Sequence, residues 1–354
     1  MNRSRSIRNK HFFVLICLSG IMLSVARRQM PNAEAPKLHL SEYGFFSGKL
    51  SNLAPAQRVY PYDVNAPLFS DYAVKARFFY LPERTKISLS DSLAWDFPEG
   101  SILIKNFFYP LDAGKPESGR RILETRLLLR EEKGWKALEY LWNEDQDDAT
   151  LEVAGAGFPV SWVGPDGKKK EIQYIAPNLN QCKGCHSYDG RFVPLGTSTR
   201  QLNRSVNGKN QLADWAEQGL LSSDHEFDPA TLPQMVDYRL EHTTSAMLNE
   251  QARAYLDANC AHCHNPHGPA ASSGMFLNIG ELQPGRLGVN KPPVAAGRGS
   301  GRRKYGIVPG KPQESILVYR MESDDPGVRM PELGRQLPHK EGIDLIRSWI
   351  REMK

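Results

Sequence analysis

The chain has few cysteines, little net charge outside its first residues and only one long apolar run. Five cysteines among 354 residues are too few for a disulfide-stabilised scaffold. The formal net charge is +5, and four of these charges come from basic residues before position 11, in a stretch without acids. The remainder is nearly neutral, which argues against nucleic acid or a membrane surface as a partner.

The apolar run covers Phe12–Val25 and follows a basic segment. It is shorter than the roughly 20 apolar residues that a membrane-spanning helix needs. Small residues at Ser24 and Ala26 suit signal peptidase. We therefore expect residues 1–26 to be a cleaved signal peptide, and the rest to be periplasmic or extracytoplasmic without a membrane span. The alternatives are an uncleaved anchor and, less favoured, a lipoprotein at Cys17.

The other four cysteines lie in two pentapeptides of one pattern, Cys182-Lys183-Gly184-Cys185-His186 and Cys260-Ala261-His262-Cys263-His264. Cys-x-x-Cys-His is the attachment pattern of c-type haem. Two thiols three residues apart can add to the two vinyl groups of one porphyrin, and the histidine that follows can reach the iron. We therefore predict two covalently attached haem c groups. The attachment sites are Cys182, Cys185, Cys260 and Cys263, and the iron ligands are His186 and His264.

Cysteine pairs of this spacing also occur in three kinds of site that hold no haem. A disulfide within each pair is possible in an oxidising compartment. A zinc ribbon would place its two pairs roughly 15–20 residues apart, whereas these pairs begin at Cys182 and Cys260. A thioredoxin-like motif requires a βαβ setting, which the sequence does not predict. The histidine after both pairs and the export signal favour haem.

Met330 is the expected sixth ligand of the second haem iron. It lies 66 residues after His264, precedes Pro331 and is not part of a periodic helical face. A thioether is a soft ligand that raises the reduction potential of haem iron. Met321, at the end of an expected helix, is the competing candidate.

For the first haem, the sequence leaves the sixth ligand open. Met235, 49 residues after His186, is the candidate. His225, His242 and Met247 lie within similar reach. An open, five-coordinate iron fits the sequence nearly as well.

The middle of the chain predicts antiparallel β structure. Residues 27–83 are expected to be an extended, proline-rich lead-in, and residues 84–176 to be a β-rich module. Turns at Gly134 and at Gly164-Pro165-Asp166-Gly167 predict two hairpins. The expected strands are Ile102–Tyr109, Arg121–Arg130, Trp135–Trp142, Val160–Val163 and Glu171–Ile175.

Residues 177–245 hold the first haem motif, and residues 246–354 hold the second. Periodic apolar positions predict helices over Ala246–Ala261 and Lys340–Met353. The predicted fold class is therefore α+β. An N-terminal antiparallel β-rich module is followed by two haem-binding segments, and the second of these is an all-α, cytochrome c-like domain.

The order of helix, Cys-x-x-Cys-His, loops, Met-Pro and final helix resembles the class I cytochrome c domain. Most of residues 60–354 also resembles a family of bacterial dihaem c-type cytochromes of unassigned function. The segments that carry this resemblance are FPEGSILIKNF, NQCKGCH, RQLNR, NQLADWAEQGLL, ARAYLDANCAHCHNPHG, VPGKPQESILVYRMES and RMPELG. Because that family has no assigned reaction, the resemblance implies haem binding but no substrate.

Three functions are compatible with these features. The favoured one is electron transfer between unidentified redox partner proteins through two six-coordinate haems. The alternative is an enzyme whose first haem keeps an open position for peroxide or another small oxidant. No acid–base pair flanks the first motif in the sequence, and a peroxidase needs groups that move protons. In a third, weaker hypothesis the β module binds a partner, and the haem-binding part supplies its redox function.

The remaining charged and histidine positions have less specific interpretations. The cluster Arg298, Arg302, Arg303 and Lys304 lies in a glycine-rich loop. It could pair with haem propionates or an acidic partner, but a solvated loop is the favoured interpretation. His262 and His267 are expected to be solvent-facing or peripheral.

Overall fold

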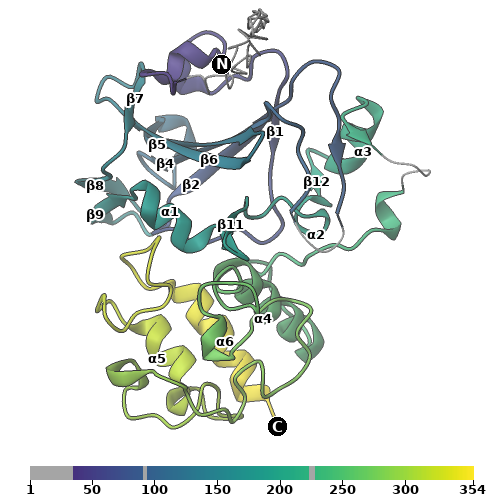
Figure 1. Cartoon of the computed structure of the whole chain (residues 1–354). Coiled ribbons are helices and arrows are strands. Elements are labelled where there is room, and N and C mark those ends of the chain that lie inside the picture. Colours follow the sequence, from purple (N-terminus) through teal and green to yellow (C-terminus); the bar gives the residue numbers. More distant parts are fainter. Residues whose placement is uncertain (1–34, 91–93, 223–227) are drawn as a thin grey trace, which may run out of the picture. The chain divides into compact units, whose positions relative to one another are not determined.

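A six-stranded antiparallel sheet organises the chain from Lys37 onward (Figure 1). In spatial order its strands are β1 (Val59–Tyr62), β2 (Val74–Tyr80), β4 (Ile102–Pro110), β5 (Arg120–Glu131), β6 (Gly134–Trp142) and β7 (Ala149–Glu152). The computed structural model describes residues 35–90, 94–222 and 228–354. The predicted signal peptide, Cys17 and His225 lie outside these ranges.

The first two strands come from the stretch expected to be an extended lead-in. β1 contains Pro61, which lacks an amide hydrogen for a ladder. β1 is the edge strand of the sheet, where a proline can be accommodated. The predicted strands at β4, β5 and β6 are present, with bounds within one or two residues of those expected.

One face of the sheet is apolar and buried. Phe78, Ile104 and Leu127 are register partners on β2, β4 and β5. They belong to a core cluster with Leu40 and Phe46, from the segment before β1. This segment therefore covers one side of the sheet.

The opposite face carries charge. Arg77, Lys105 and Arg126 are also register partners on β2, β4 and β5 and are sequence neighbours of the apolar row. Because side chains alternate along a strand, these three cations project from the face opposite the apolar cluster. α1 (Leu179–Cys185) lies against this side of the sheet (Figure 1).

Shorter elements complete the chain. The remaining strands are β3 (Ile87–Ser88), β8 (Ala156–Val163), β9 (Lys169–Ala176), β10 (Ser187–Tyr188), β11 (Arg191–Phe192), β12 (Ser205–Val206), β13 (Lys209–Asn210) and β14 (Leu221–Ser222). β8 and β9 form the predicted second hairpin. The other helices are α2 (Thr199–Leu202), α3 (Gln211–Glu217), α4 (Ser245–Asn259), α5 (Ile316–Glu322) and α6 (Lys340–Glu352). None of the helices in the described ranges is long and apolar enough to cross a membrane.

The predicted fold class is wrong for residues 246–354, which are not an all-α cytochrome c-like domain. Between α4 and α5 the chain forms short 3-10 turns and isolated parallel bridges, which join Val289 to Ile307 and Tyr305 to Ser315. Glycine and proline recur through this stretch. Both residue types disfavour helix interiors. The chain between α4 and α5 therefore turns repeatedly and forms no further α-helix.

The core of this C-terminal part is also shared with earlier segments. Ala66, Met235 and Tyr238 pack in the same hydrophobic cluster as α4 and α6. The buried carboxylate of Asp71 accepts backbone N–H bonds from Gln336 and Leu337, each at 2.7 Å. The residues around the second motif are therefore built into the whole unit and are not a separate cytochrome domain.

Candidate functional site

The first motif sits at the end of α1. Asn178 caps this helix, with its side chain accepting the Gln181 N–H at 3.0 Å, and the helix ends at Cys185. His186 Nδ1 lies 2.7 Å from the carbonyl oxygen of Val193 and must donate to it. Burial lowers the pKa of His186 to about 4, so its ring is neutral. Nε2 is then an unprotonated nitrogen that is free to bind a metal.

The second motif repeats this arrangement. α4 runs directly into Cys260, which is its C-terminal cap. His264 Nδ1 lies 3.2 Å from the carbonyl oxygen of Met275, and burial lowers the pKa of the imidazole. A backbone acceptor on one ring nitrogen orients the other nitrogen toward a metal, as is usual for ligating histidines. Both histidines therefore have the contacts expected of iron ligands.

The two motifs touch each other. The ligand atoms of Cys185, His262 and Cys263 all lie within 4.8 Å of one another. Cys263 Sγ is also 3.5 Å from the carbonyl oxygen of Gly184. The hydrogen bond between the two thiols lowers the pKa of Cys185 and raises that of Cys263. His262, expected to be peripheral, lies at this junction, whereas half-exposed His267 pairs with Asp189 at 2.9 Å.

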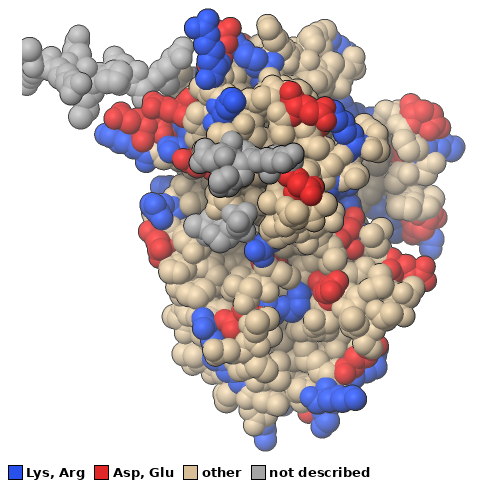
Figure 2. All heavy atoms as spheres, turned by 90° about the vertical axis from the view of Figure 1, so that its right-hand side faces the viewer, with Lys and Arg blue, Asp and Glu red and all other residues tan. Residues whose placement is uncertain are grey.

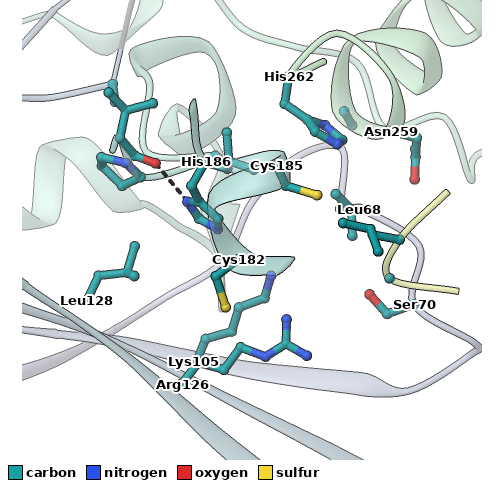
Figure 3. A pocket seen from close by; sticks show the side chains of 18 of the residues that line it. Leu68, Ser70, Lys105, Arg126, Leu128, Cys182, Cys185, His186, Asn259 and His262 are labelled. Carbon is teal, nitrogen blue, oxygen red and sulfur yellow. Dashed lines mark hydrogen bonds between the residues drawn. The ribbon is translucent and has the colours of Figure 1, made fainter. Parts of the chain in front are cut away.

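A large cavity opens beside the first motif (Figure 3). Its volume is about 1310 Å³, above the roughly 300–1,000 Å³ of common ligand pockets. Cys182, Cys185 and His186 line it, as do residues of the sheet and of the segment 329–343. In Figure 3 the second ring nitrogen of His186 faces the side on which Cys182 and Lys105 lie. The end of α4 and the second motif also contribute, among them Asn259 and His262, so the cavity is bounded by parts of the chain that are far apart in sequence.

The sheet supplies charged groups to this cavity. Arg77, Lys105 and Arg126 line it, and so does Glu139. Burial, followed by the nearby Arg77 and Arg126, lowers the pKa of Lys105 to about 7. Burial, with Glu124 beside it, raises the pKa of Glu139 to about 10, so this carboxyl is protonated at neutral pH. These acid–base groups lie far before the first motif in the chain, and sequence reasoning missed them.

Met330 borders the same cavity, and a buried arginine holds its loop. The Arg335 side chain donates from Nη2 to the carbonyl oxygens of Met330 at 2.8 Å and Met321 at 3.1 Å. Arg335 Nη1 and Arg329 Nε are buried and have no partner among the described residues. This loop also reaches the first motif, since a Cβ on Gly184 would lie 3.0 Å from Leu333. Met330 therefore borders the cavity beside the first motif, although the sequence predicts it as a ligand of the second haem.

The other predicted ligand candidates are placed differently. Met235 is buried in the core shared with α4 and α6 and does not border the cavity. Met321 is buried in the same core and borders the cavity. His242 and Met247 are exposed. Of the candidates for the first iron, none within the described ranges borders the cavity.

The predicted basic cluster does not line the cavity either. Arg298 is exposed and pairs with Asp325 at 3.1 Å. Arg303 lies over the Tyr319 ring at 4.2 Å and donates to the Gln313 carbonyl oxygen. These contacts are those of a surface loop. On the face in Figure 2, acidic and basic side chains are interspersed.

The residues fit two c-type haem groups. The four thiols of the motifs are unpaired, which leaves them available for vinyl groups. Each motif histidine uses Nδ1 for a backbone carbonyl oxygen, and its Nε2 has no hydrogen bond within the described part of the chain. Within the described ranges, buried guanidinium nitrogens of Arg329 and Arg335 lack acceptors, as donors to the carboxylates of a bound porphyrin would. Cys185, His262 and Cys263 could instead bind a metal ion, but not while the cysteines are bonded to porphyrin.

Comparisons with known proteins do not narrow this choice. No family model, curated protein or solved structure matches the chain. The function of the site therefore has to be inferred from its own geometry.

Proposed function

We propose that this protein is an exported dihaem c-type cytochrome that transfers electrons between redox partner proteins. The observation that carries the proposal is the repeated arrangement of two Cys-x-x-Cys-His motifs with unpaired thiols. In both, the histidine Nδ1 donates to a backbone carbonyl oxygen and Nε2 is left for iron. When bound, haem supplies one-electron redox chemistry.

The chain's own residues would have separate tasks in this function. Cys182 and Cys185 would hold one porphyrin, and Cys260 and Cys263 would hold the other. His186 and His264 would each ligate one iron. The contact between Cys185 and Cys263 supports close approach of the two porphyrin edges, because each sulfur would be bonded to one edge. Met330, in a loop held by Arg335, would ligate one of the irons.

The test is haem content after expression with a c-type haem maturation system. The pyridine haemochrome assay is expected to give two haems per chain. The pair Cys182→Ala with Cys185→Ala should leave one, and so should Cys260→Ala with Cys263→Ala. Metal analysis of the same samples tests the competing Cys185–His262–Cys263 site. A wild-type protein with zinc and no covalent haem would overturn the proposal.

A second candidate, an oxidant-reducing enzyme, is favoured by one observation. Lys105 and Glu139 border the cavity beside the first motif, so groups able to exchange protons are present there. Carbon monoxide binding to the reduced protein separates the two functions. If neither haem binds it, both irons are firmly six-coordinate, as electron transfer requires. Ready binding by one haem would favour the enzyme.

A further inference from the structure

Arg77, Lys105 and Arg126, the row of cations that crosses the sheet at the cavity wall, have too few anionic partners. Arg77 pairs with Asp63 at 3.1 Å, but Asp63 is shared with Arg204 at 3.0 Å. Arg126 pairs with the fully buried Glu124. Glu139 lies next along the same row, opposite Arg126, and its raised pKa keeps it neutral. Two carboxylates thus serve more than two cations.

Lys105 is the cation left over. It lies between Arg77 and Arg126 in the register of the sheet. Within the described part of the chain its ammonium has no hydrogen bond or ion pair, and its only specific contact is the Phe107 ring at 5.0 Å. Figure 3 shows Lys105 and Arg126 extending from the sheet toward Cys182. Burial, with Arg77 and Arg126 nearby, lowers the pKa of this ammonium to about 7. Its position beside two guanidinium groups without an anionic partner therefore requires an explanation.

The neighbouring Lys75 has a hydrogen-bond acceptor of the kind that Lys105 lacks. Lys75 projects from the same face of β2, two residues before Arg77. Its ammonium donates to the carbonyl oxygen of Leu68 at 3.2 Å, and it does not border the cavity. Lys105 has no such acceptor among the described residues and does border the cavity. The unpaired cation is therefore the one that a ligand in the cavity can reach.

We propose that Lys105, flanked by Arg77 and Arg126, forms an anion-binding site in the cavity that takes a carboxylate or another small oxyanion. Guanidinium and ammonium groups make their strongest hydrogen bonds to such oxygens. An anion would supply the charge that this wall lacks.

Two sources can provide this chemistry. One is a propionate of the first haem, and for this source the inference rests on the proposed function. The other is a free anion that enters the cavity beside the haem. Cys182 lies near Arg126, and the vinyl edge of a porphyrin is opposite its propionate edge. The position of Arg126 near a vinyl attachment site therefore favours the free anion over a propionate. The experiment separates these two sources.

The experiment uses the full exported chain with its haem, and the probe is malonate. Thermal unfolding is followed as malonate is added, with sodium chloride holding the ionic strength constant. Saturable stabilisation of the wild type is expected. Lys105→Met should raise the dissociation constant about tenfold or more, since a hydrogen bond to a charged group is lost. Lys86→Met, which removes the same charge from an exposed position, should leave the constant unchanged.

The second arm measures reduction potentials. If malonate has no effect and Lys105→Met, but not Lys86→Met, lowers the potential of one haem, the site holds a propionate. A buried cation disfavours the oxidised, more positive haem, so its loss lowers the potential. If Lys105→Met changes neither the dissociation constant for malonate nor the reduction potential of a haem, the anion site is overturned.

The two proposals fail in distinguishable ways. A chain without covalent haem overturns the cytochrome function, and the malonate titration still tests the anion site on that chain. A chain with two haems and no response in either arm overturns only the anion site. Lys105→Gln gives a second variant should Lys105→Met fail to fold, because it also removes the charge.

Discussion

Cys185 and Cys263 are in contact although 78 residues separate them in the chain. Each is the second cysteine of its motif. If both bear haem, the two porphyrins approach each other at these sulfurs. Electrons could then pass directly between the haems, without a separate protein pathway.

Coupling of the two haems can be measured by circular dichroism in the Soret region. Closely spaced haems have coupled transition dipoles, so the wild-type spectrum is expected to differ from the sum of two one-haem variants. These variants are Cys182→Ala with Cys185→Ala, and Cys260→Ala with Cys263→Ala. A wild-type spectrum equal to the sum would place the haems too far apart to interact.

Met330 and Met235 give a matched pair of variants. Met330 borders the cavity and Met235 is packed in the core. Met330→Ala is expected to turn one haem high-spin and to lower its potential, because the soft ligand is lost. Met235→Leu is expected to leave the visible spectrum unchanged and to cost less than about 1.5 kcal/mol of stability, as volume-conserving swaps do. A changed spectrum in Met235→Leu, with none in Met330→Ala, would reverse the assignment.

Arg335 is expected to be a positioning residue for Met330. The residue is 3% exposed, and its guanidinium donates to several carbonyl oxygens around the Met330 loop. Lysine cannot reproduce this planar set of donors. Arg335→Lys should lower the free energy of unfolding by about 1–3 kcal/mol and should increase carbon monoxide binding by the haem that Met330 is proposed to ligate. Arg298→Lys, at an exposed ion pair, should change stability by about 0.5 kcal/mol or less.

His339 makes stability depend on pH. Its ring stacks on Phe69 with centroids 4.1 Å apart, and burial lowers the pKa of the imidazole to about 4. The pKa of an unfolded histidine is about 6.5. Below that value the unfolded chain binds more protons than the folded one, so stability falls as the pH drops toward 4. The loss should reach about 3 kcal/mol.

Urea unfolding of wild type and His339→Gln between about pH 7.5 and 4.5 measures this contribution. The difference in unfolding free energy between the two proteins should shrink, in favour of the variant, as the pH falls. A pH-independent difference would show that His339 is not held neutral in the folded state. The comparison cancels the contributions of the other histidines.

Gly342 fixes the close approach of α6 to α4. A Cβ at this position would lie 2.4 Å from the ring of Tyr255, which is buried. Gly342→Ala is therefore expected to destabilise the protein by about 1–3 kcal/mol through overpacking. Gly285→Ala is the control, because a Cβ there meets open space. Equal effects of the two substitutions on the melting temperature would contradict this packing argument.

The sequence was informative where a signal is local. The β5–β6 hairpin and the final helix depend on turn residues and periodicity, and the structure confirms both. The two Cys-x-x-Cys-His motifs are equally local patterns, and their binding of haem stays a prediction. The predicted all-α class of the C-terminal part is wrong, because the order of helix, motif, Met-Pro and helix does not determine how the chain between them folds. The glycine- and proline-rich stretch between Cys263 and Ser315 breaks regular structure there.

The charged wall of the cavity could not be found from the sequence for a different reason. Arg77, Lys105 and Arg126 are neighbours only through the register of three strands, and nothing in their local context sets them apart. Their relation to Cys182 depends on how α1 lies on the sheet. The contact of Cys185 with Cys263 likewise exists only in the folded chain. Such contacts are set by tertiary packing, which single-sequence patterns do not encode.

The cavity is enclosed by residues from before β2, from the first motif and from the segment 329–343. Its walls meet only after the most distant parts of the chain have come together. A porphyrin bonded to the early cysteines would therefore already be present when the last wall closes over it. In that case the chain would fold around the porphyrin. A chain that received the porphyrin only after folding would first have to open this cavity again.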